Sequence, residues 1–298
     1  MKPPAFEYHA PTTLDEALEV LAEVGSDGKV LAGGQSLIPI LNMRLAAPAH
    51  LVDINRIPGL SCVHADAAGV RVGATARHTD VERDDTAHAV VPLLRQALRL
   101  VAHPAVRNRG TTVVSLAHAD PSGEMTAVLA LLGGSVELAR RGSSRTVSAA
   151  EFFVGPLESC VAPGELALAA YFPRPAARTG TAFVEQARRH GDYAICGLAA
   201  AVTLDDDLRI TAARGAYISV SATPLVLDLT DAVAGATPDT ADWAAAGRLA
   251  SARVDPEPDI HVSAEYRRHM AGVLTARALA AAAADAARTV QACRDWER

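Results

Sequence analysis

Apolar residues recur at helical spacing near the start of the chain. They share one face of the predicted helix: Leu14, Ala17, Leu18, Leu21 and Ala22. Thr13 followed by Glu16 forms a capping box, in which a hydroxyl and a carboxylate satisfy free amide groups at a helix start. Gly25 suits the end of the helix. The pattern therefore predicts a helix over residues 14–24.

A strand, a glycine turn and a second helix start follow. Residues 29–31 form a short strand-like run, the pair Gly33–Gly34 comes next, and another apolar run begins at Leu37. Paired glycines let the backbone adopt positive φ and bring bare N–H groups against a ligand. This order of elements is typical of a diphosphate site, although a Gly-Gly pair alone more often marks only a turn. His50–Ile54 predicts a second strand, which closes a βαβ-like unit near residue 55.

The middle of the chain alternates between strand and helix patterns. We predict strands at Gly69–Ala74, Ser135–Ala139, Thr146–Ser148 and Leu166–Phe172, and helices at Ala89–Val101 and Glu124–Leu132. The strand that starts at Ser135 should pair with the strand that starts at Thr146. These elements indicate a second α/β unit over residues 56–175.

The pattern changes after Pro173–Gly180, which is the best linker in the chain. Three runs predict antiparallel strands: Phe183–Arg188, Tyr193–Leu204 and Arg209–Val220, the last two joined at Asp205–Asp207. Two helices should follow, at Thr240–Arg253 and from Ser263 to about Arg294, with tight packing in the alanine-rich stretch from Ala278. Residues 181–298 therefore form a third unit, an antiparallel sheet with a helical bundle.

Composition narrows the class of protein. The chain has 298 residues, half of them hydrophobic, and a net charge of −6, which indicates a globular protein and argues against nucleic acid as a partner. Charges interrupt the apolar runs and the N-terminus lacks a secretory pattern, so we expect no membrane segment. Four cysteines without a C-x-x-C pair favour reduced thiols in the cytoplasm. The histidines are scattered, and we expect no metal site.

Four segments, taken in order, resemble the FAD-binding medium subunit of molybdenum hydroxylases, the carbon monoxide dehydrogenase and xanthine dehydrogenase group. The first combines Ala32–Pro39 with Arg44–Ala46 and Leu51–Ile54, and the second combines Arg107–Thr111 with Ser115–Pro121. The third is Ala187–Ala194, and the fourth combines Asp259–His261 with Ser263–His269. The resemblance covers nearly the whole chain.

The resemblance implies an α+β fold, in which two N-terminal α/β pieces (PCMH-like) clasp FAD ahead of an antiparallel sheet with C-terminal helices. It implies these cofactor-binding residues: Ala32, Gly33, Gly34, Gln35, Ser36, Leu37, Thr111, Ser115, Asp120 and Glu124. We name Tyr193, Asp120 and His118 as the candidate catalytic residues, and the resemblance places Tyr193 near the isoalloxazine. Such a subunit passes electrons from a molybdenum subunit, through an iron–sulfur subunit, to an external acceptor. A homo-oligomer is also compatible with the sequence.

Two departures from the family pattern support an alternative. Thr112–Ser115 stands where glycines are usual, and Tyr217–Pro224 replaces a second glycine-rich stretch. Valine is a poor occupant of positive φ, and its Cβ would fill the diphosphate notch. The alternative is therefore a flavin-free enzyme that acts on a small organic substrate through acid–base groups: Asp120, Glu124, His118, His190, Asp192 and Tyr193. A binding subunit without cofactor or chemistry is a third hypothesis.

Several candidate residues also have ordinary structural interpretations. Asp120 precedes Pro121, so it suits a turn or a helix cap. His118 suits a packed core position. Arg107 and Arg109 could be solvated charges, although the resemblance implies a structural or phosphate-side position for them.

Overall fold

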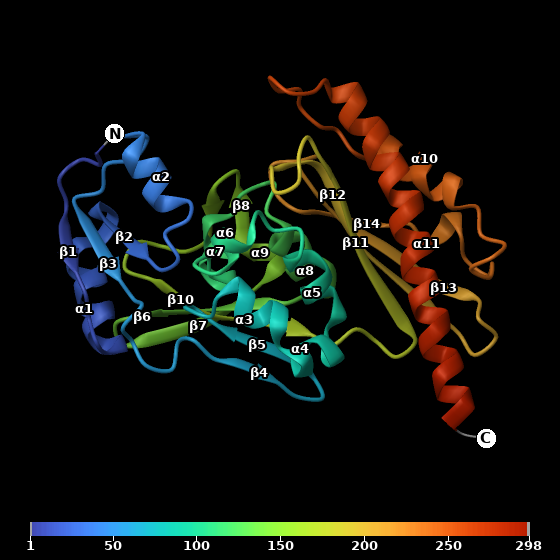
Figure 1. Cartoon of the computed structure of the whole chain (residues 1–298), viewed down its shortest axis with the longest axis horizontal. Helices are drawn as coiled ribbons and strands as arrows, with labels where there is room; N and C mark the ends of the chain where they lie inside the picture. Colours follow the sequence, from blue (N-terminus) through green and yellow to red (C-terminus); the bar gives the residue numbers. More distant parts are fainter. Residues whose placement is uncertain (1, 297–298) are drawn as a thin grey trace.

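A computed structural model describes residues 2–296, with side chains as far as residue 291, and shows three regions side by side (Figure 1). The N-terminal region lies at one end of the molecule. The helix-rich middle region is central, and the C-terminal sheet with its long helix forms the other end. The α+β class and this order of regions confirm the predicted fold.

The N-terminal region is a small parallel sheet with two helices. Its strands are β1 (Glu7–His9), β2 (Gly28–Leu31) and β3 (His50–Asp53), in the order β1-β3-β2, and its helical elements are α1 (Leu14–Val24), η1 (Gly25–Asp27) and α2 (Leu37–Asn42). The Thr13–Glu16 capping box is present at the start of α1. Ala17, Leu18 and Leu21 on α1 pack in one core with Val52 and Ile54, whereas Ala22, which the sequence placed on the same face, is exposed.

The middle region has a five-stranded antiparallel sheet in the order β4-β5-β10-β6-β7. Its strands are β4 (Val63–Ala65), β5 (Gly69–Gly73), β6 (Ser135–Arg140), β7 (Ser143–Ser148) and β10 (Leu166–Pro173), and a hairpin of β8 (Phe153–Gly155) and β9 (Glu158–Ser159) stands apart. Its helices are α3 (His78–Arg83), α4 (Asp85–Val90), α5 (Pro92–Leu98), α6 (Pro104–Arg107), α7 (Thr112–His118), α8 (Glu124–Leu132) and α9 (Ala149–Phe152). Ser135 pairs with Ser148, which confirms the predicted β6–β7 pairing.

The single helix predicted over residues 89–101 is wrong. The chain forms α4 and α5 instead, separated at Val91, which has φ −133° and ψ 80°. Pro92 explains the break, because proline has no N–H to continue a helix and excludes helical geometry at the residue before it. Pro92 then serves as the first residue of α5.

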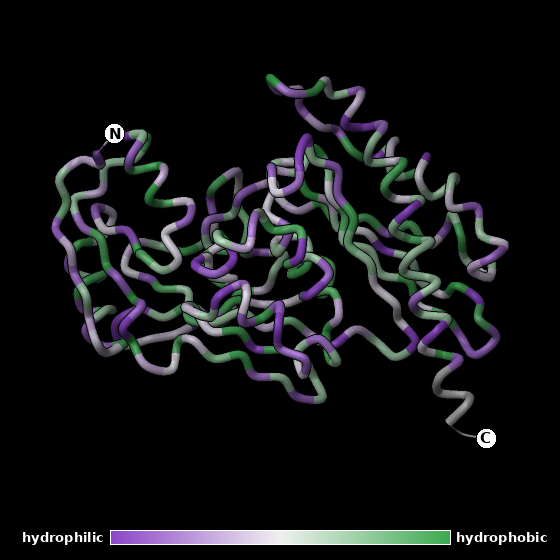
Figure 2. Tube along the Cα trace, in the orientation of Figure 1, coloured by the Kyte–Doolittle hydropathy of each residue, from purple (hydrophilic) through white to green (hydrophobic). Residues whose placement is uncertain are grey.

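The C-terminal sheet lies between two layers of helices. Its strands are β11 (Thr179–Ala187), β12 (Ala194–Leu204), β13 (Ile210–Ile218) and β14 (Leu225–Asp228), in sequence order and antiparallel, and η2 (Thr230–Ala232), α10 (Trp243–Arg253) and α11 (Ala264–Trp296) follow. The long helix α11 runs across one face, while α8 and α5 of the middle region contact the other. Because both faces are covered, β12 is apolar almost throughout and does not alternate (Figure 2).

One predicted boundary in this region needs correction, and one strand was not predicted. Strand β11 begins at Thr179, inside the predicted linker and four residues before Phe183. Strand β14 was not predicted, since it is short and directly follows Pro224, and its pairing with β13 supplies the context that the local sequence lacks. Helices α10 and α11 account for the predicted helical bundle.

Residues 264–291 of α11 are long and apolar enough to cross a membrane by length and composition, which the sequence-based expectation of interrupted apolar runs did not anticipate. Half of the apolar window is buried inside the protein. Ala278, Ala282 and Ala286 belong to the core that joins α11 to the C-terminal sheet. The apolar character of α11 is therefore explained by its packing on β11 and β12.

Candidate cofactor-binding site

The glycine turn lies between β2 and α2, as the sequence predicts. Gly34 has φ +72°, a conformation that favours glycine, and its carbonyl accepts a hydrogen bond from the Ile38 amide at 3.0 Å. The amides just before Ile38 therefore stand at the open start of α2, where a helix has no acceptors of its own. Gln35 folds back, and its side-chain amide donates to the Gly33 carbonyl at 3.2 Å.

A second loop, from the middle region, closes against this turn at Gly33. A Cβ added to Gly33 would lie 2.6 Å from the Arg109 carbonyl oxygen and 2.8 Å from the Gly110 Cα. These distances are shorter than a carbon atom tolerates, so the two backbones meet at a position that only glycine can occupy. Thr111 comes next as the N-terminal cap of α7, and its buried Oγ1 has no hydrogen-bond partner within the described structure.

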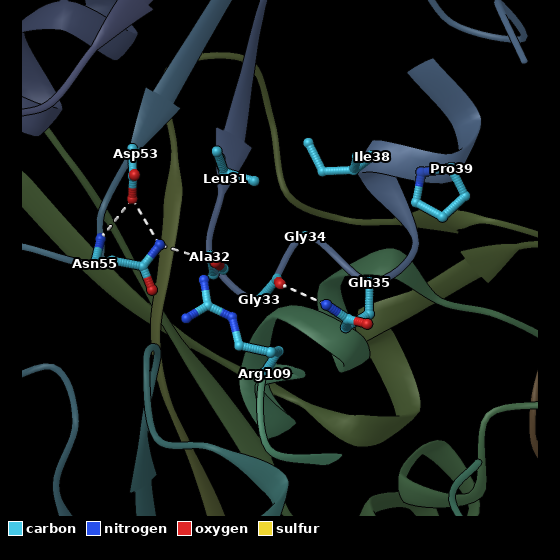
Figure 3. Close-up of a pocket in the computed structure, with 10 residues that line it drawn as sticks. All are labelled: Leu31, Ala32, Gly33, Gly34, Gln35, Ile38, Pro39, Asp53, Asn55 and Arg109. Atoms are coloured by element: carbon cyan, nitrogen blue, oxygen red, sulfur yellow. Dashed lines mark hydrogen bonds between the residues drawn. The ribbon is translucent and has the colours of Figure 1, made fainter. Parts of the chain in front are cut away.

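A cavity of about 490 Å³ opens where the two loops meet (Figure 3). It is lined by Leu31, Ala32, Gly33, Gly34, Gln35, Ile38, Pro39, Asp53, Asn55 and Arg109. The lining therefore includes four of the predicted cofactor residues, Ala32 to Gln35. Ser36 and Leu37 lie at the start of α2 beside it.

A hydrogen-bond network ties β1, β3 and both loops together. The Tyr8 hydroxyl donates to Asp53 Oδ2 at 2.5 Å, and Asp53 Oδ1 accepts from the amide and the side chain of Asn55. Asn55 Nδ2 also donates to the Ala32 carbonyl at 2.8 Å. Arg77 completes the network by donating to Asn55 Oδ1 and to the Arg109 carbonyl, at 2.7 and 2.6 Å. The glycine turn is thus held in place from both regions.

Tyr8, Asn55 and Arg77 are site residues that the sequence did not indicate. Each forms a hydrogen bond with a residue more than twenty positions away in the sequence, as in the Arg77–Asn55 and Asn55–Ala32 contacts. Asp53 lies in the segment Leu51–Ile54, which resembles the family, but the sequence did not predict its role. A polar residue at the end of a predicted strand, such as Asp53 or Asn55, was the only local signal.

The electrostatics of the two loops suit an anion. Burial and then the nearby charge of Arg109 lower the pKa of Arg77, so two guanidinium groups lie close to each other at the cavity. Burial opposes the ionisation of Asp53, but hydrogen bonds from Tyr8 and Asn55 outweigh it and lower the pKa of Asp53. The free amides before α2, the unpartnered Thr111 hydroxyl and the two nearby guanidinium groups are groups that bind a diphosphate. The residues present therefore fit a dinucleotide cofactor.

The predicted obstruction by valine is wrong. Residues 112–118 form α7, so Val113 and Val114 have helical backbone geometry and not positive φ. Val113 is fully buried in the core of the middle region, and Val114 packs against the core of the N-terminal region. Both valines serve as packing residues, and neither belongs to the lining of the cavity described above.

The second departure also has a structural explanation. Ser219 has φ +63°, the left-handed conformation that a glycine would adopt more easily. Its amide donates to the Pro121 carbonyl at 2.8 Å. Its hydroxyl donates to the Ala194 carbonyl at 2.7 Å and shares a second hydrogen bond with the Ser122 hydroxyl at 2.8 Å. These bonds hold the strained residue at the joint between the middle region and the C-terminal sheet.

An acidic cluster lies near this joint. Burial, with contributions from Glu185 and Asp120, raises the pKa of Glu124 to about 8, and burial raises the pKa of Glu185 to about 7. Desolvation, followed by the nearby charges of Asp120 and Glu124, raises the pKa of Tyr193, although 73% of the residue is exposed to solvent. Asp120 and Glu124 thus influence each other and Tyr193 electrostatically, and Glu185, which the sequence did not indicate, acts on Glu124 in the same way.

The other candidate acid–base residues do not join this cluster. His118 is the last residue of α7, and within residues 2–296 no hydrogen bond or ion pair links it to Asp120, Glu124 or Tyr193. His190 instead lies against His103, with ring centroids 5.8 Å apart, and Asp192 is exposed. Asp120 Oδ1 accepts from the Ser122 amide at 2.9 Å, so the turn role considered for Asp120 is present.

The two arginines of the second loop have different surroundings. The side chain of Arg107 is buried, and its Nε donates to Glu82 at 2.8 Å while its guanidinium also binds the carbonyls of Val101 and Ala102. Arg107 is therefore structural. Arg109 lines the cavity and is the basic residue in that lining.

Fold and site together define a dinucleotide-binding protein, and comparison with known proteins identifies its family. Residues 4–175 match the family of FAD binding domains in molybdopterin dehydrogenase, and residues 181–282 match the CO dehydrogenase flavoprotein C-terminal domain. Subunit alpha of the 6-hydroxypseudooxynicotine dehydrogenase complex from Paenarthrobacter nicotinovorans is 38% identical over 95% of this chain and 96% of its own length. The carbon monoxide dehydrogenase medium chain from Afipia carboxidovorans is 36% identical, with 96% and 99% covered.

Solved structures give the same result. Quinoline 2-oxidoreductase from Pseudomonas putida 86 superimposes with a TM-score of 0.89 at 37% identity, over 96% of this chain and 99% of that chain. The chain therefore belongs to the FAD-binding medium subunits of the molybdenum hydroxylases. It is an FAD-binding oxidoreductase subunit, and the flavin-free alternative has no support.

The acidic cluster yields a prediction about pH. The folded-state pKa of Glu124, about 8, exceeds its ordinary value of 4.5, so the folded chain holds this proton more tightly than the unfolded chain. Stability that depends on the proton is present below pH 4.5 and is lost as the pH rises toward 8. We expect Glu124→Gln, which stays neutral, to gain about 1–3 kcal/mol over wild type at alkaline pH and little at acidic pH.

Urea unfolding of both proteins across this pH range measures the difference. Glu185→Gln should behave in the same way over a narrower range, because the pKa of Glu185 rises only to about 7. A constant difference between Glu124→Gln and wild type at all pH values would contradict the assigned protonation.

Proposed function

We propose that this chain passes electrons through a bound FAD, from partner subunits to an external acceptor. The observation that carries the proposal is the meeting of two loops at Gly33, beside a cavity with open amides and Arg109. When bound, the flavin supplies the redox chemistry, and the protein supplies position and electrostatics. The medium subunits and complex subunits among the relatives support a role within an assembly.

The two ends of the cofactor would be held by different residues. We assign the diphosphate to the backbone of residues 32–37 and to Thr111 and Ser115 at the start of α7. We assign the redox end to Asp120, Glu124 and Tyr193, where the raised pKa of Glu124 keeps that carboxyl group protonated near neutral pH. The neutral Glu124 carboxyl group adds no negative charge next to the flavin ring that would accept the electrons. The catalytic role predicted for His118 stays a hypothesis, because no described hydrogen bond or ion pair links His118 to Asp120, Glu124 or Tyr193.

The partners would be an iron–sulfur subunit and a molybdenum subunit. The similar subunits belong to enzymes with different names: caffeine dehydrogenase, nicotine 6-hydroxylase and carbon monoxide dehydrogenase. The variety of these names supports the proposal that substrate choice resides in the partner and not in this chain. We place the complex in the cytoplasm, in keeping with the free thiols of Cys62, Cys160 and Cys196.

Purification of the tagged chain from its native cells tests the proposal. We expect a yellow complex that contains FAD, iron, labile sulfide and molybdenum, and whose flavin absorbance is bleached by substrate and restored by an acceptor dye. A colourless chain that purifies alone and does not bind added FAD would refute the proposal. A yellow chain without partners would retain the cofactor assignment and refute the electron path.

A further inference from the structure

A cluster of two histidines and a glutamate lies on the N-terminal sheet, apart from the cofactor cavity. His9 Nε2 and His50 Nδ1 are 3.1 Å apart. Glu7 places its carboxylate oxygens 3.9 Å from His9 Nε2 and 3.5 Å from His50 Nδ1. One ligand atom from each residue fits within a span of 4.8 Å. Three groups that commonly bind metals therefore converge on one point.

The sheet register produces this convergence. Strands β1 and β3 run parallel, with Glu7 opposite His50 and His9 opposite Val52. Glu7 and His9 are two residues apart on β1, so they point to the same face as His50. The histidine side chains are 23% and 27% exposed, which holds the rings in place while leaving a path for an ion. His9 and His50 are 41 residues apart in sequence, and for this reason no spacing motif predicted the cluster.

The spacing fits a divalent transition metal. With metal–nitrogen bonds of about 2.0–2.1 Å, two nitrogens in a tetrahedral zinc site lie roughly 3.4 Å apart. The 3.1 Å separation between the imidazole nitrogens is close to this value. Two neutral imidazoles and one carboxylate form a ligand set suited to Zn²⁺ and its neighbours, and three protein ligands leave a position for water.

Without an ion, the same contact is a hydrogen bond between the rings, in which one facing nitrogen carries a hydrogen and the other accepts it. An ion requires both facing nitrogens to be free of hydrogen. The donor ring would therefore move its N–H to its other nitrogen, a change of tautomer that keeps both rings neutral. No proton is gained or lost in this exchange.

We propose that Glu7, His9 and His50 bind a divalent transition-metal ion of the Zn²⁺ type, which clips the edge strand β1 to β3. Strand β1 pairs only with β3 among the described strands. Tyr8, between Glu7 and His9, points to the opposite face and donates to Asp53 of the cofactor cavity. The ion would thus stabilise the strand that carries Tyr8.

The test is calorimetric titration of zinc chloride into the metal-free chain, purified without a polyhistidine tag. We expect one site per chain that His9→Ala and His50→Ala each weaken more than about tenfold. Glu7→Gln should weaken it less, and it tests the site even where a histidine variant folds poorly, since the Glu7 side chain is 68% exposed. His64→Ala, at an exposed histidine on β4, is the matched control and should leave binding unchanged.

Thermal unfolding gives a second measurement that is independent of flavin content. Zinc should raise the melting temperature of wild type and His64→Ala, a chelator should reverse the rise, and His9→Ala and His50→Ala should show none. Absence of zinc binding in wild type, or equal binding in wild type and both histidine variants, would overturn the proposal. The latter result would assign the zinc to other groups, such as the free thiols.

Discussion

Gly33→Ala is expected to abolish tight FAD binding. The new methyl group would lie 2.6 Å from the Arg109 carbonyl oxygen and 2.8 Å from the Gly110 Cα, so the clash is with backbone and not with a movable side chain. The two loops must separate, and the amides before α2 then lose their alignment with Arg109 and Thr111. We expect FAD affinity to fall at least about a hundredfold, which equals about 2.7 kcal/mol.

Flavin fluorescence quenching during titration of FAD into the apoprotein measures this loss. Gly155→Ala is the matched control, because a Cβ at Gly155 meets only Glu158 atoms at 3.6 Å and beyond. The same chemical change should there leave FAD affinity unaltered. Wild-type affinity in Gly33→Ala would show that the contact between the loops does not form the cofactor site.

Gly180→Ala is expected to have the largest effect on stability. Gly180 is on β11, directly beneath α11, and a Cβ there would overlap the backbone of Ala282 and Ala286. The amide of the next residue, Thr181, donates to Asp285 Oδ2 at 3.1 Å, and this bond holds α11 close to β11. Because neither backbone can move without opening this core, we expect a loss of about 2–4 kcal/mol in the free energy of unfolding.

Chemical denaturation of wild type, Gly180→Ala and the control Gly155→Ala checks this expectation. The loss should be confined to Gly180→Ala and should coincide with increased hydrogen exchange in α11 and β11. Equal unfolding midpoints in all three proteins would mean that α11 does not approach the sheet as closely as described.

Local patterns were sufficient for most elements of the fold. The α1 helix was predicted from Thr13, Glu16 and its apolar face. The capping box is present, and Ala17, Leu18 and Leu21 of that face are buried, while Ala22 is exposed. The exceptions depend on effects outside the local pattern. Pro92 divides a region that is apolar enough for one helix, and β14 depends on pairing with β13 and not on its own residues.

The local sequence pattern predicted only one of the two loops that form the cofactor site. Gly33 and Gly34 lie together in the chain, so their turn could be predicted, but the partner loop and the support from Tyr8, Asn55 and Arg77 come from distant segments. Valine residues at 113 and 114 were misinterpreted because their backbone was assumed to match the glycines of the family pattern. Helix α7 replaces that backbone and turns both side chains toward cores.

The central claim is that the turn at residues 32–37 and the loop at residues 109–111 grip the diphosphate of FAD. Parallel titrations of the apoprotein with FAD and with riboflavin, which has the same ring but no phosphate, test this claim most directly. We predict that FAD binds at least about a hundredfold more tightly than riboflavin, and that Gly33→Ala removes most of the difference. Equal affinities for the two flavins in wild type would contradict the assignment.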